Sequence, residues 1–247
     1  MKIATLNLRH NNDRWDERFP LVVDALHGTD ADVIGLQEVW LPIQQAHLIA
    51  HDLNQRTPNR PYSVHVEPKW GDNPVESIGI LSRLPVLDSA RLDLPIEPRV
   101  AQRITVEIDG QSAHIANTHL HHRPRDESVR LPQMRAALDW MFAHSAGRWL
   151  LMGDMNAIPE SATIQAATER LKSAHFELHH AEPITFPTPL VTLENYPPVC
   201  IDYIFYDANT IDVKSVHVFA NQCHADDATL YPSDHYGLVA EIEPKTI

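Results

Sequence analysis

Short runs rich in β-branched and aromatic residues recur along the whole of this 247-residue chain, and helical segments separate only some of them. So many strands with so few helices predict two packed sheets flanked by helices, and the intervening helices favour mixed sheets over a purely antiparallel sandwich. The predicted strands are Lys2–Leu8, Val33–Gln37, Ser63–Val66, Ser77–Ser82, Ala101–Ile108, Ser112–Thr118, Trp149–Gly153, Ile201–Tyr206, Lys214–Phe219 and Gly237–Ile242.

Apolar residues recur at helical spacing in several of the remaining segments. The predicted helices are Asp16–Gly28, Pro42–Asn54, Ser128–Ser145 and Ser161–Ala167. We find no internal repeat and no flexible Gly/Ser linker, and 43% apolar residues can fill a sizeable core. We therefore expect one α/β domain over residues 1–247.

The net charge of −13 is unevenly distributed. Residues 1–149 carry 16 Lys and Arg against 19 Asp and Glu, whereas residues 150–247 carry 4 against 14. Proteins that grip many phosphates of a nucleic-acid backbone normally present a basic face. The charge therefore disfavours long nucleic acid as a partner.

Two features bear on the cellular compartment. Cys200 and Cys223 are the only cysteines, and nothing else in the sequence indicates an oxidising environment. The first residues read directly into a strand without a signal-peptide pattern, and no window approaches the roughly 18 consecutive apolar residues of a membrane span. We expect a reduced, cytoplasmic protein without a membrane span.

Five short polar motifs stand at the edges of apolar runs. They are Thr5–Arg9, Leu36–Val39, Asn117–Leu120, Gly153–Asn156 and Ser233–His235. Taken singly, each is an ordinary loop or turn sequence. Together they supply carboxylates, amides and histidines, which are the groups needed to hold a hard cation against a phosphate.

The ordered set of motifs, with Ile201–Phe205 as a sixth, resembles the endonuclease/exonuclease/phosphatase superfamily over nearly the whole chain, from Thr5 to Glu243. The resemblance implies a four-layer α/β/β/α sandwich of two mixed β-sheets flanked by helices. It also implies a single catalytic domain that hydrolyses phosphoric esters with the help of a divalent cation.

The resemblance assigns metal-binding roles to Asn7, Glu38 and Asp234. Glu38 corresponds to the principal metal carboxylate, Asn7 contacts the metal or the phosphate, and Asp234 lies near the metal or a second metal position. Mg²⁺ suits oxygen ligands and keeps several waters, and Mn²⁺ is a substitute for it.

Catalytic roles follow in the same way. Asp154 and Asn156 match the pair that positions the attacking water and stabilises charge on phosphorus. His235 matches a phosphate-site histidine, and Asp202 matches the carboxylate that orients it and favours imidazolium. His119 matches a leaving-group acid or transition-state donor, and an unperturbed pKa near 6.5 would suit proton transfer at neutral pH.

Three arginines are expected substrate contacts: Arg9, Arg123 and Arg130. Arg9 follows Asn7 by two positions, so both point to the same side of an extended segment, although a surface charge is the alternative. Arg123 and Arg130 belong to a basic segment beyond His119, for which a solvated surface is the alternative. The clustered His119–His122 segment lacks a carboxylate or thiolate at zinc-ligand spacing, which disfavours zinc.

The proline-rich stretch Pro183–Val199 cannot form a helix or a central strand, and it predicts a long loop that either borders the site or is a plain surface connection. Within phosphoester hydrolysis we favour a small or short phosphodiester. Nuclease, sphingomyelinase-like and inositol phosphoesterase activities are alternatives, and a catalytically silent scaffold is a different class. The physiological substrate, the number of metal ions and the oligomeric state stay open.

Overall fold

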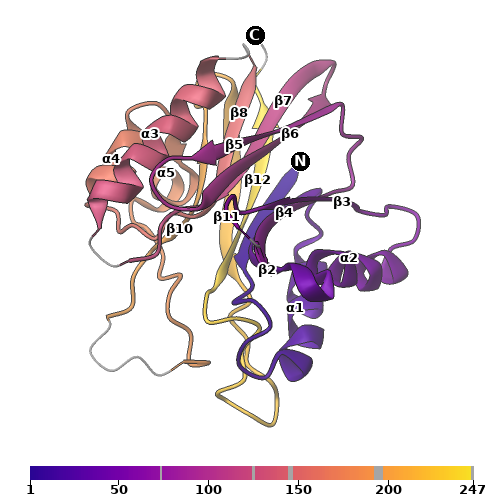
Figure 1. The fold of residues 1–247 in the computed structure, drawn as a ribbon. Helices are drawn as coiled ribbons and strands as arrows, with labels where there is room; N and C mark the ends of the chain where they lie inside the picture. Colours follow the sequence, from indigo (N-terminus) through magenta and orange to yellow (C-terminus); the bar gives the residue numbers. More distant parts are fainter. Residues whose placement is uncertain (73, 124–125, 144–146, 192–196, 246–247) are drawn as a thin grey trace.

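Two six-stranded β-sheets stack face to face, and helices cover both outer faces (Figure 1). The computed structural model describes residues 1–72, 74–123, 126–143, 147–191 and 197–245. The architecture confirms the four-layer α/β/β/α sandwich of two mixed sheets expected from the sequence.

The first sheet, sheet A, has the strand order β11-β12-β1-β2-β4-β3. Its strands are β1 (Lys2–Asn7), β2 (Val33–Trp40), β3 (Ser63–Pro68), β4 (Glu76–Ser82), β11 (Ile211–Phe219) and β12 (Gly237–Pro244). Strands β1 and β2 are parallel, and their neighbours pair antiparallel. The carboxyl ends of β1 and β2 therefore lie at the same edge of the sheet.

The second sheet, sheet B, has the order β5-β6-β7-β8-β10-β9. Its strands are β5 (Asp88–Leu94), β6 (Arg99–Ile108), β7 (Gln111–His119), β8 (Arg148–Asp154), β9 (Lys172–Ser173) and β10 (Asp202–Tyr206). Strands β7 and β8 are parallel. The sequence did not predict β5 or β9: β5 is a largely exposed edge strand with three charged residues, and β9 has only two residues.

The helices are α1 (Trp15–Thr29), α2 (Gln45–Arg56), α3 (Glu127–Ala143), α4 (Ala162–Thr168) and α5 (Ala174–His179), with a 3₁₀ turn at Leu41–Ile43. Helix α2 begins later than predicted because this turn contains Pro42 and ends at Gln44, which is left-handed. The short α5 was not predicted. The end of the predicted helix Ser128–Ser145 lies outside the described residues.

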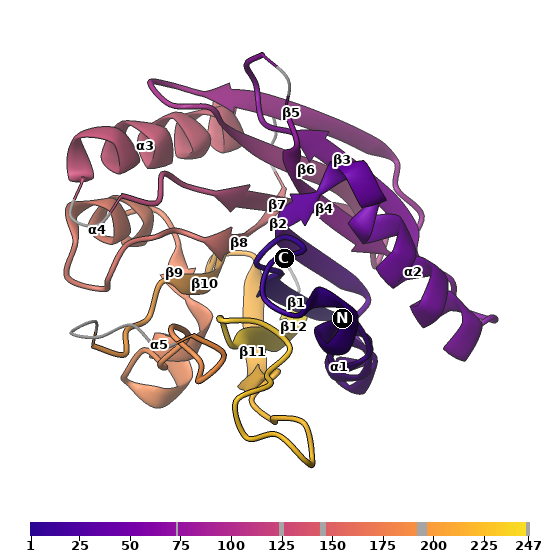
Figure 2. The same cartoon turned by 60° about the horizontal axis from the view of Figure 1, so that its bottom comes forward.

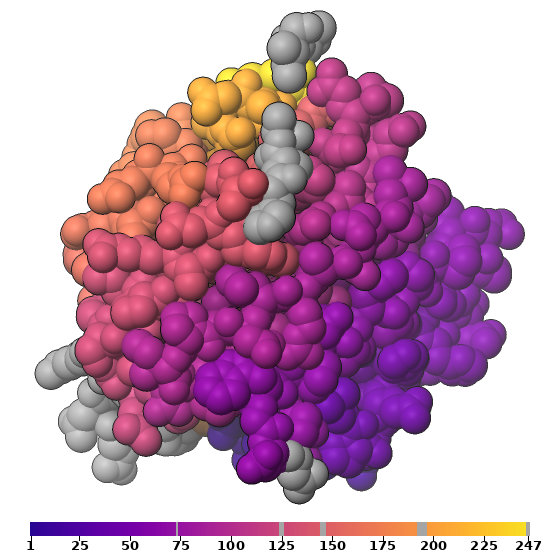
Figure 3. All heavy atoms as spheres, turned by 45° about the horizontal axis from the view of Figure 1, so that its top comes forward, coloured from indigo at the N-terminus to yellow at the C-terminus, as the bar shows by residue number. Residues whose placement is uncertain are grey.

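Three apolar layers hold the sandwich together. Strand alternation turns Ile3 and Val33 toward Ile115 and Leu150 between the sheets. Ala4 and its outward neighbours pack on α1 and α2, while α3 and α4 cover sheet B. Figure 2 shows these two pairs of helices on opposite outer faces. In the space-filling view the early and later parts of the chain form one continuous surface (Figure 3).

One buried amide joins the sheets beneath the polar edge. The Asn117 Nδ2 group donates to the carbonyls of Leu36 and Gly79 at 3.0 and 2.9 Å, and its Oδ1 accepts from Gln37 at 2.7 Å. Asn117 is fully buried, so each of these bonds replaces water that the fold excludes. Asn117 therefore has a structural role within the polar motif that contains His119.

Gly153 shows how tightly the backbone fits before Asp154. Its φ is +138°, and a Cβ added there would lie 2.0 Å from the carbonyl oxygen of Thr118. We expect Gly153→Ala to lower the free energy of unfolding by more than about 2 kcal/mol, measured by urea denaturation. Gly28→Ala is the matched control, because a Cβ there meets nothing within 4 Å. An unchanged midpoint for Gly153→Ala would contradict the backbone geometry.

Candidate active site

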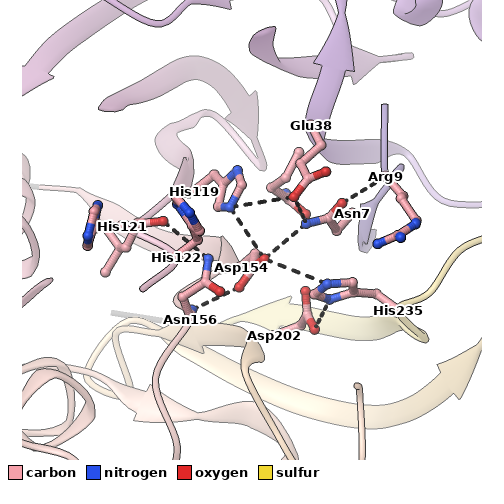
Figure 4. Close-up of polar contacts among 12 residues, drawn as sticks. Asn7, Arg9, Glu38, His119, His121, His122, Asp154, Asn156, Asp202 and His235 are labelled. Carbon is pink, nitrogen blue, oxygen red and sulfur yellow. Dashed lines mark hydrogen bonds and ion pairs between the residues drawn. The ribbon is translucent and has the colours of Figure 1, made fainter. Parts of the chain in front are cut away.

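Polar side chains from both sheets converge at the edge where the parallel strands end (Figure 4). Asn7 ends β1, His119 ends β7 and Asp154 ends β8, while Asp202 begins β10. The register pairs Asp154 with His119 on one side and with Asp202 on the other. Three neighbouring strands of sheet B therefore present their polar ends side by side.

Glu38 lies inside β2, which ends at Trp40. The sequence predicted that the strand ends at Gln37, which would have placed Glu38 just beyond it. The pairing of β2 with β4 shifts register between Leu36 and Val39, which marks a β-bulge at Glu38. Glu38 also has φ of 52°. Bulges beside active sites re-aim side chains, and non-glycine residues with positive φ concentrate at functional sites. The bulge directs the Glu38 carboxylate to the centre.

Asn7 connects the carboxylates of the two sheets. Its Nδ2 donates to Asp154 Oδ2 at 2.9 Å and lies 3.3 Å from Glu38 Oε1. Its Oδ1 accepts the backbone N–H of Arg9 at 2.9 Å. Asn7 thus presents an N–H₂ group to the centre. This geometry suits an orienting role or contact with a phosphate oxygen, and it does not support the metal-ligand role expected from the sequence.

His235 and Asp202 form a buried ion pair. His235 Nδ1 lies 2.8 Å from Asp202 Oδ2. Burial alone would lower the pKa of His235, but the carboxylates of Asp202 and Asp234 outweigh it and raise the pKa to about 10. The ring is therefore an imidazolium at neutral pH.

Asp154 is the carboxylate at the middle of the site. Its Oδ1 accepts the backbone N–H of Asn156 at 2.8 Å, and its Oδ2 lies 3.9 Å from His235 Nε2. Burial and the nearby Asp202 charge raise the pKa of Asp154 to about 7. The side chain of Asn156 donates to the Leu120 carbonyl at 3.2 Å. Asp154 can therefore exchange a proton near neutral pH.

His119 differs from the sequence expectation. Arg99 Nη1 lies 3.0 Å from His119 Nδ1, and burial together with this cation lowers the pKa of His119 well below its ordinary value. The ring is neutral, so the unperturbed pKa expected for a leaving-group acid is wrong for this environment. An Nδ1 that accepts from Arg99 leaves the proton on Nε2, which faces Asp154 Oδ2 at 3.5 Å and Glu38 Oε1 at 4.0 Å.

A charged group behind His119 was missed from the sequence. Glu76 contacts His10 Nε2 at 2.8 Å and Arg99 Nη1 at 3.0 Å, and it also pairs with Lys69. Burial would raise the pKa of Glu76, but its contact with His10 and the nearby Lys69 cation hold it well below its usual range. Glu76 and Arg99 each begin a strand, so both carry the same signal as the other site residues, a polar side chain at a strand end.

Arg9 and Asp234, expected to contact phosphate and metal respectively, contact each other. Arg9 Nη1 lies 2.5 Å from Asp234 Oδ2, and Arg9 also pairs with Asp13. Asp234 is nearly buried, whereas Asp13 lies at the surface. The pair adjoins the centre through Asn7, which accepts the Arg9 backbone N–H.

The other two expected arginines do not join this group. Arg130 is buried, pairs with Glu127 at 2.9 Å and donates to the backbone carbonyls of His121 and Arg123. These contacts hold the segment after β7 against α3, which is a structural role in place of the expected substrate contact. Arg123 is exposed on that segment, and Arg125 lies outside the described residues.

The described part of the proline-rich loop packs directly on the site. Phe186 contacts the His235 ring at a centroid distance of 4.7 Å. Thr188 Oγ1 donates to the Ser233 carbonyl at 2.6 Å, and Thr185 Oγ1 accepts the backbone N–H of Asp202 at 3.1 Å. The loop therefore borders the site, and residues 192–196 of the predicted stretch lie outside the described residues.

At this site, and among the residues that the structure describes, two groups of side chains could hold a divalent cation. Asp154, Asp202 and His235 place ligand atoms within 4.8 Å of one another, but the imidazolium of His235 repels a cation. Glu38 and Asp154 instead offer oxygen atoms on either side of Asn7 Nδ2. Within the described chain, the buried His119 Nε2–H beside them has no hydrogen-bond partner, which suits a phosphate oxygen held next to the cation. These oxygen donors fit a hard cation with its water ligands.

A model of the Endonuclease/Exonuclease/phosphatase family matches residues 4–235, so the chain belongs to that family. The catalytic domain of human Nocturnin with bound sulfate superposes with a TM-score of 0.77 at 22% identity, covering 99% of this chain and 93% of that one. TDP2 of D. rerio with a single-strand DNA product gives 0.81 at 18% identity, covering 98% of each chain. Both likenesses show the shared fold.

Among curated proteins, the chain resembles 2',5'-phosphodiesterase 12 of Mus musculus, with 28% identity over 158 residues. The match covers 53% of this chain and 26% of the mouse protein. This chain therefore matches about a quarter of the length of that relative. Within the described residues, no helix has the length and apolar character needed to cross a membrane.

The His235–Asp202 pair predicts a measurable titration. In metal-free protein we expect the His235 ring to stay protonated up to about pH 10, followed by NMR of its ring resonances. Asp202→Asn should lower this pKa, because burial is then opposed by one carboxylate fewer.

Since the folded-state pKa is raised above the unfolded value near 6.5, the pair stabilises the fold fully below pH 6.5. That stabilisation is lost as the pH rises toward 10. A ring that titrates near 6.5 would contradict the pairing.

Proposed function

We propose that this chain is a divalent-metal-dependent phosphodiesterase that hydrolyses a small or short phosphodiester by in-line attack of water. The observation that carries the proposal is the convergence of Glu38, Asn7 and Asp154 with two histidines of different charge. Such a set can deprotonate water and stabilise negative charge in one enclosed place. Membership of the family supports the reaction class.

Asp154 is the group that accepts the proton of the attacking water. Without a bound cation, burial and the Asp202 charge raise its pKa to about 7, and a cation held beside it would lower that pKa and keep the carboxylate unprotonated, ready to accept the proton. The backbone N–H of Asn156 holds one carboxylate oxygen, and Asn7 holds the other. These bonds fix the orientation of the carboxylate before the substrate arrives. Asn156 has φ of 50°, a left-handed conformation that turns the chain just after Asp154.

The remaining donors surround the phosphate. His235 offers a charged Nε2–H and His119 a neutral Nε2–H, both directed at the space beside Asp154. Hydrogen bonds aimed at oxygens where negative charge develops are the main source of catalysis in such reactions. A bound Mg²⁺ or Mn²⁺, held by Glu38 and Asp154, would neutralise part of the same charge.

Three observations support a short diester as the substrate. The curated relatives are named 2',5'-phosphodiesterases. Residues 150–247 carry 4 basic against 14 acidic residues, and the two arginines of the site face carboxylates. A long polyanion would meet repulsion beyond the scissile phosphate.

The free thiols of Cys200 and Cys223 fit a cytoplasmic location for this activity.

Hydrolysis of bis-p-nitrophenyl phosphate tests the activity. We expect turnover with Mg²⁺ or Mn²⁺ that EDTA abolishes and that added metal restores. Glu38→Gln and His235→Ala should each lower kcat/KM by about 100-fold or more, because each removes charge stabilisation in the transition state. Asp212→Asn, an exposed carboxylate on β11, is the matched control with unchanged rate. Unaltered turnover in both site variants would refute the proposal and favour a silent scaffold.

Substrate length is tested with dinucleotides, both 2',5'- and 3',5'-linked, against duplex DNA. We expect the dinucleotides to be hydrolysed with a higher kcat/KM than the duplex. We also expect weak dependence on salt, because few phosphates are contacted. A steep loss of activity with salt, together with preference for the duplex, would identify a nuclease of long nucleic acid instead.

A further inference from the structure

The carboxylates around the centre differ in whether they have a cation of their own. Asp202 is paired with His235 at 2.8 Å, and Glu76 is paired with Lys69 and Arg99. Glu38 and Asp154 differ from them, because their shortest side-chain contact is the neutral Asn7 amide, which contacts both carboxylates, and the imidazolium of His235 lies farther from Asp154 Oδ2, at 3.9 Å. Two neighbouring carboxylates without a cation in direct contact can be balanced by one divalent ion.

Asp234 belongs to the first kind. Its Oδ2 lies 2.5 Å from Arg9 Nη1, and its Oδ1 accepts from Ser233 Oγ at 3.2 Å, so both oxygens are engaged. Its side chain is only 5% exposed. A carboxylate that is buried and bonded to a guanidinium must give up that bond before it can bind a metal ion.

The backbone holds Arg9 in this place. Its N–H donates to Asn7 Oδ1 at 2.9 Å, and its φ of 54° turns the chain so that the guanidinium reaches Asp234 and Asp13. The buried Arg18 fixes both flanking loops, since its Nη1 donates to the carbonyls of Leu8 and Pro232 at 3.1 and 2.8 Å. The Arg9–Asp234 contact is thus built into the fold.

From this arrangement we propose that Arg9 is a permanent cation in the place where Asp234 would otherwise bind a second metal ion, so that the centre holds one divalent ion, at Glu38 and Asp154. The inference rests on the proposed function, because it specifies the metal content of the same site. A fixed guanidinium also stays in place when the metal leaves, and it keeps Asp234 ordered beside His235.

Counting bound Mn²⁺ by isothermal titration calorimetry and equilibrium dialysis tests this without an activity assay. We expect one Mn²⁺ per wild-type chain, and a count near two for Arg9→Gln, because Asp13 and Asp234 are then free to bind. Arg9→Lys should keep a count of one. Arg14→Gln is the matched control with an unchanged count, since Arg14 pairs with Glu17 and Asp227 on the surface.

Two further variants separate the carboxylates, with circular dichroism confirming that each is folded. Glu38→Gln should weaken Mn²⁺ binding by more than about tenfold, whereas Asp234→Asn should leave the affinity within about twofold. A wild-type count of two, a count of one in Arg9→Gln, or a loss in Asp234→Asn equal to that in Glu38→Gln would each overturn the inference and leave the hydrolase proposal standing. Absence of any Mn²⁺ binding to the wild type would instead overturn the metal dependence of the proposed function, and this inference with it.

Discussion

The bond between Asn7 and Asp154 is the contact on which the site depends, because it joins the two sheets at their polar edge. Asn7 ends a strand of sheet A and Asp154 ends a strand of sheet B, and both side chains are buried. A buried carboxylate without partners is costly, so the sheets must stack in the register that brings this amide and this carboxylate together. Packing of the apolar layers brings the sheets together, and this polar contact defines their alignment at the edge.

The charges of the site residues also depend on how the strand ends are arranged at this polar edge. Three polar strand ends of sheet B lie in register, so Asp154 and Asp202 are held close to each other in a buried place. The imidazolium of His235 stabilises the charge of Asp202, while the pKa of Asp154 is raised, which favours its neutral form. His119 is buried beside Arg99 and is neutral. The two histidines of the site therefore differ in charge because of their neighbours.

Much of this arrangement could be predicted from the sequence, because apolar runs mark the strands and the motifs follow the runs. The carboxyl ends of β1 and β8 were located this way, and with them Asn7 and Asp154. The bulge at Glu38 could not be predicted, because it depends on pairing with β4. The same holds for the Arg9–Asp234 contact between residues 225 positions apart. The lowered pKa of His119 depends on burial and on Arg99, neither of which a linear motif contains.

The most direct test of the account is the stereochemical course at phosphorus. Asp154, both histidines and Asn7 surround one space, and the proposed role of Asp154 there is that of a base for water, not of a nucleophile. A phosphorothioate diester of known configuration, hydrolysed in ¹⁸O-labelled water, reports how many displacements occur. We expect a single inversion, with one ¹⁸O in the phosphorothioate monoester product, because water attacks in line and the alcohol leaves. Net retention would contradict it, since retention requires a covalent intermediate and therefore a nucleophile on the protein.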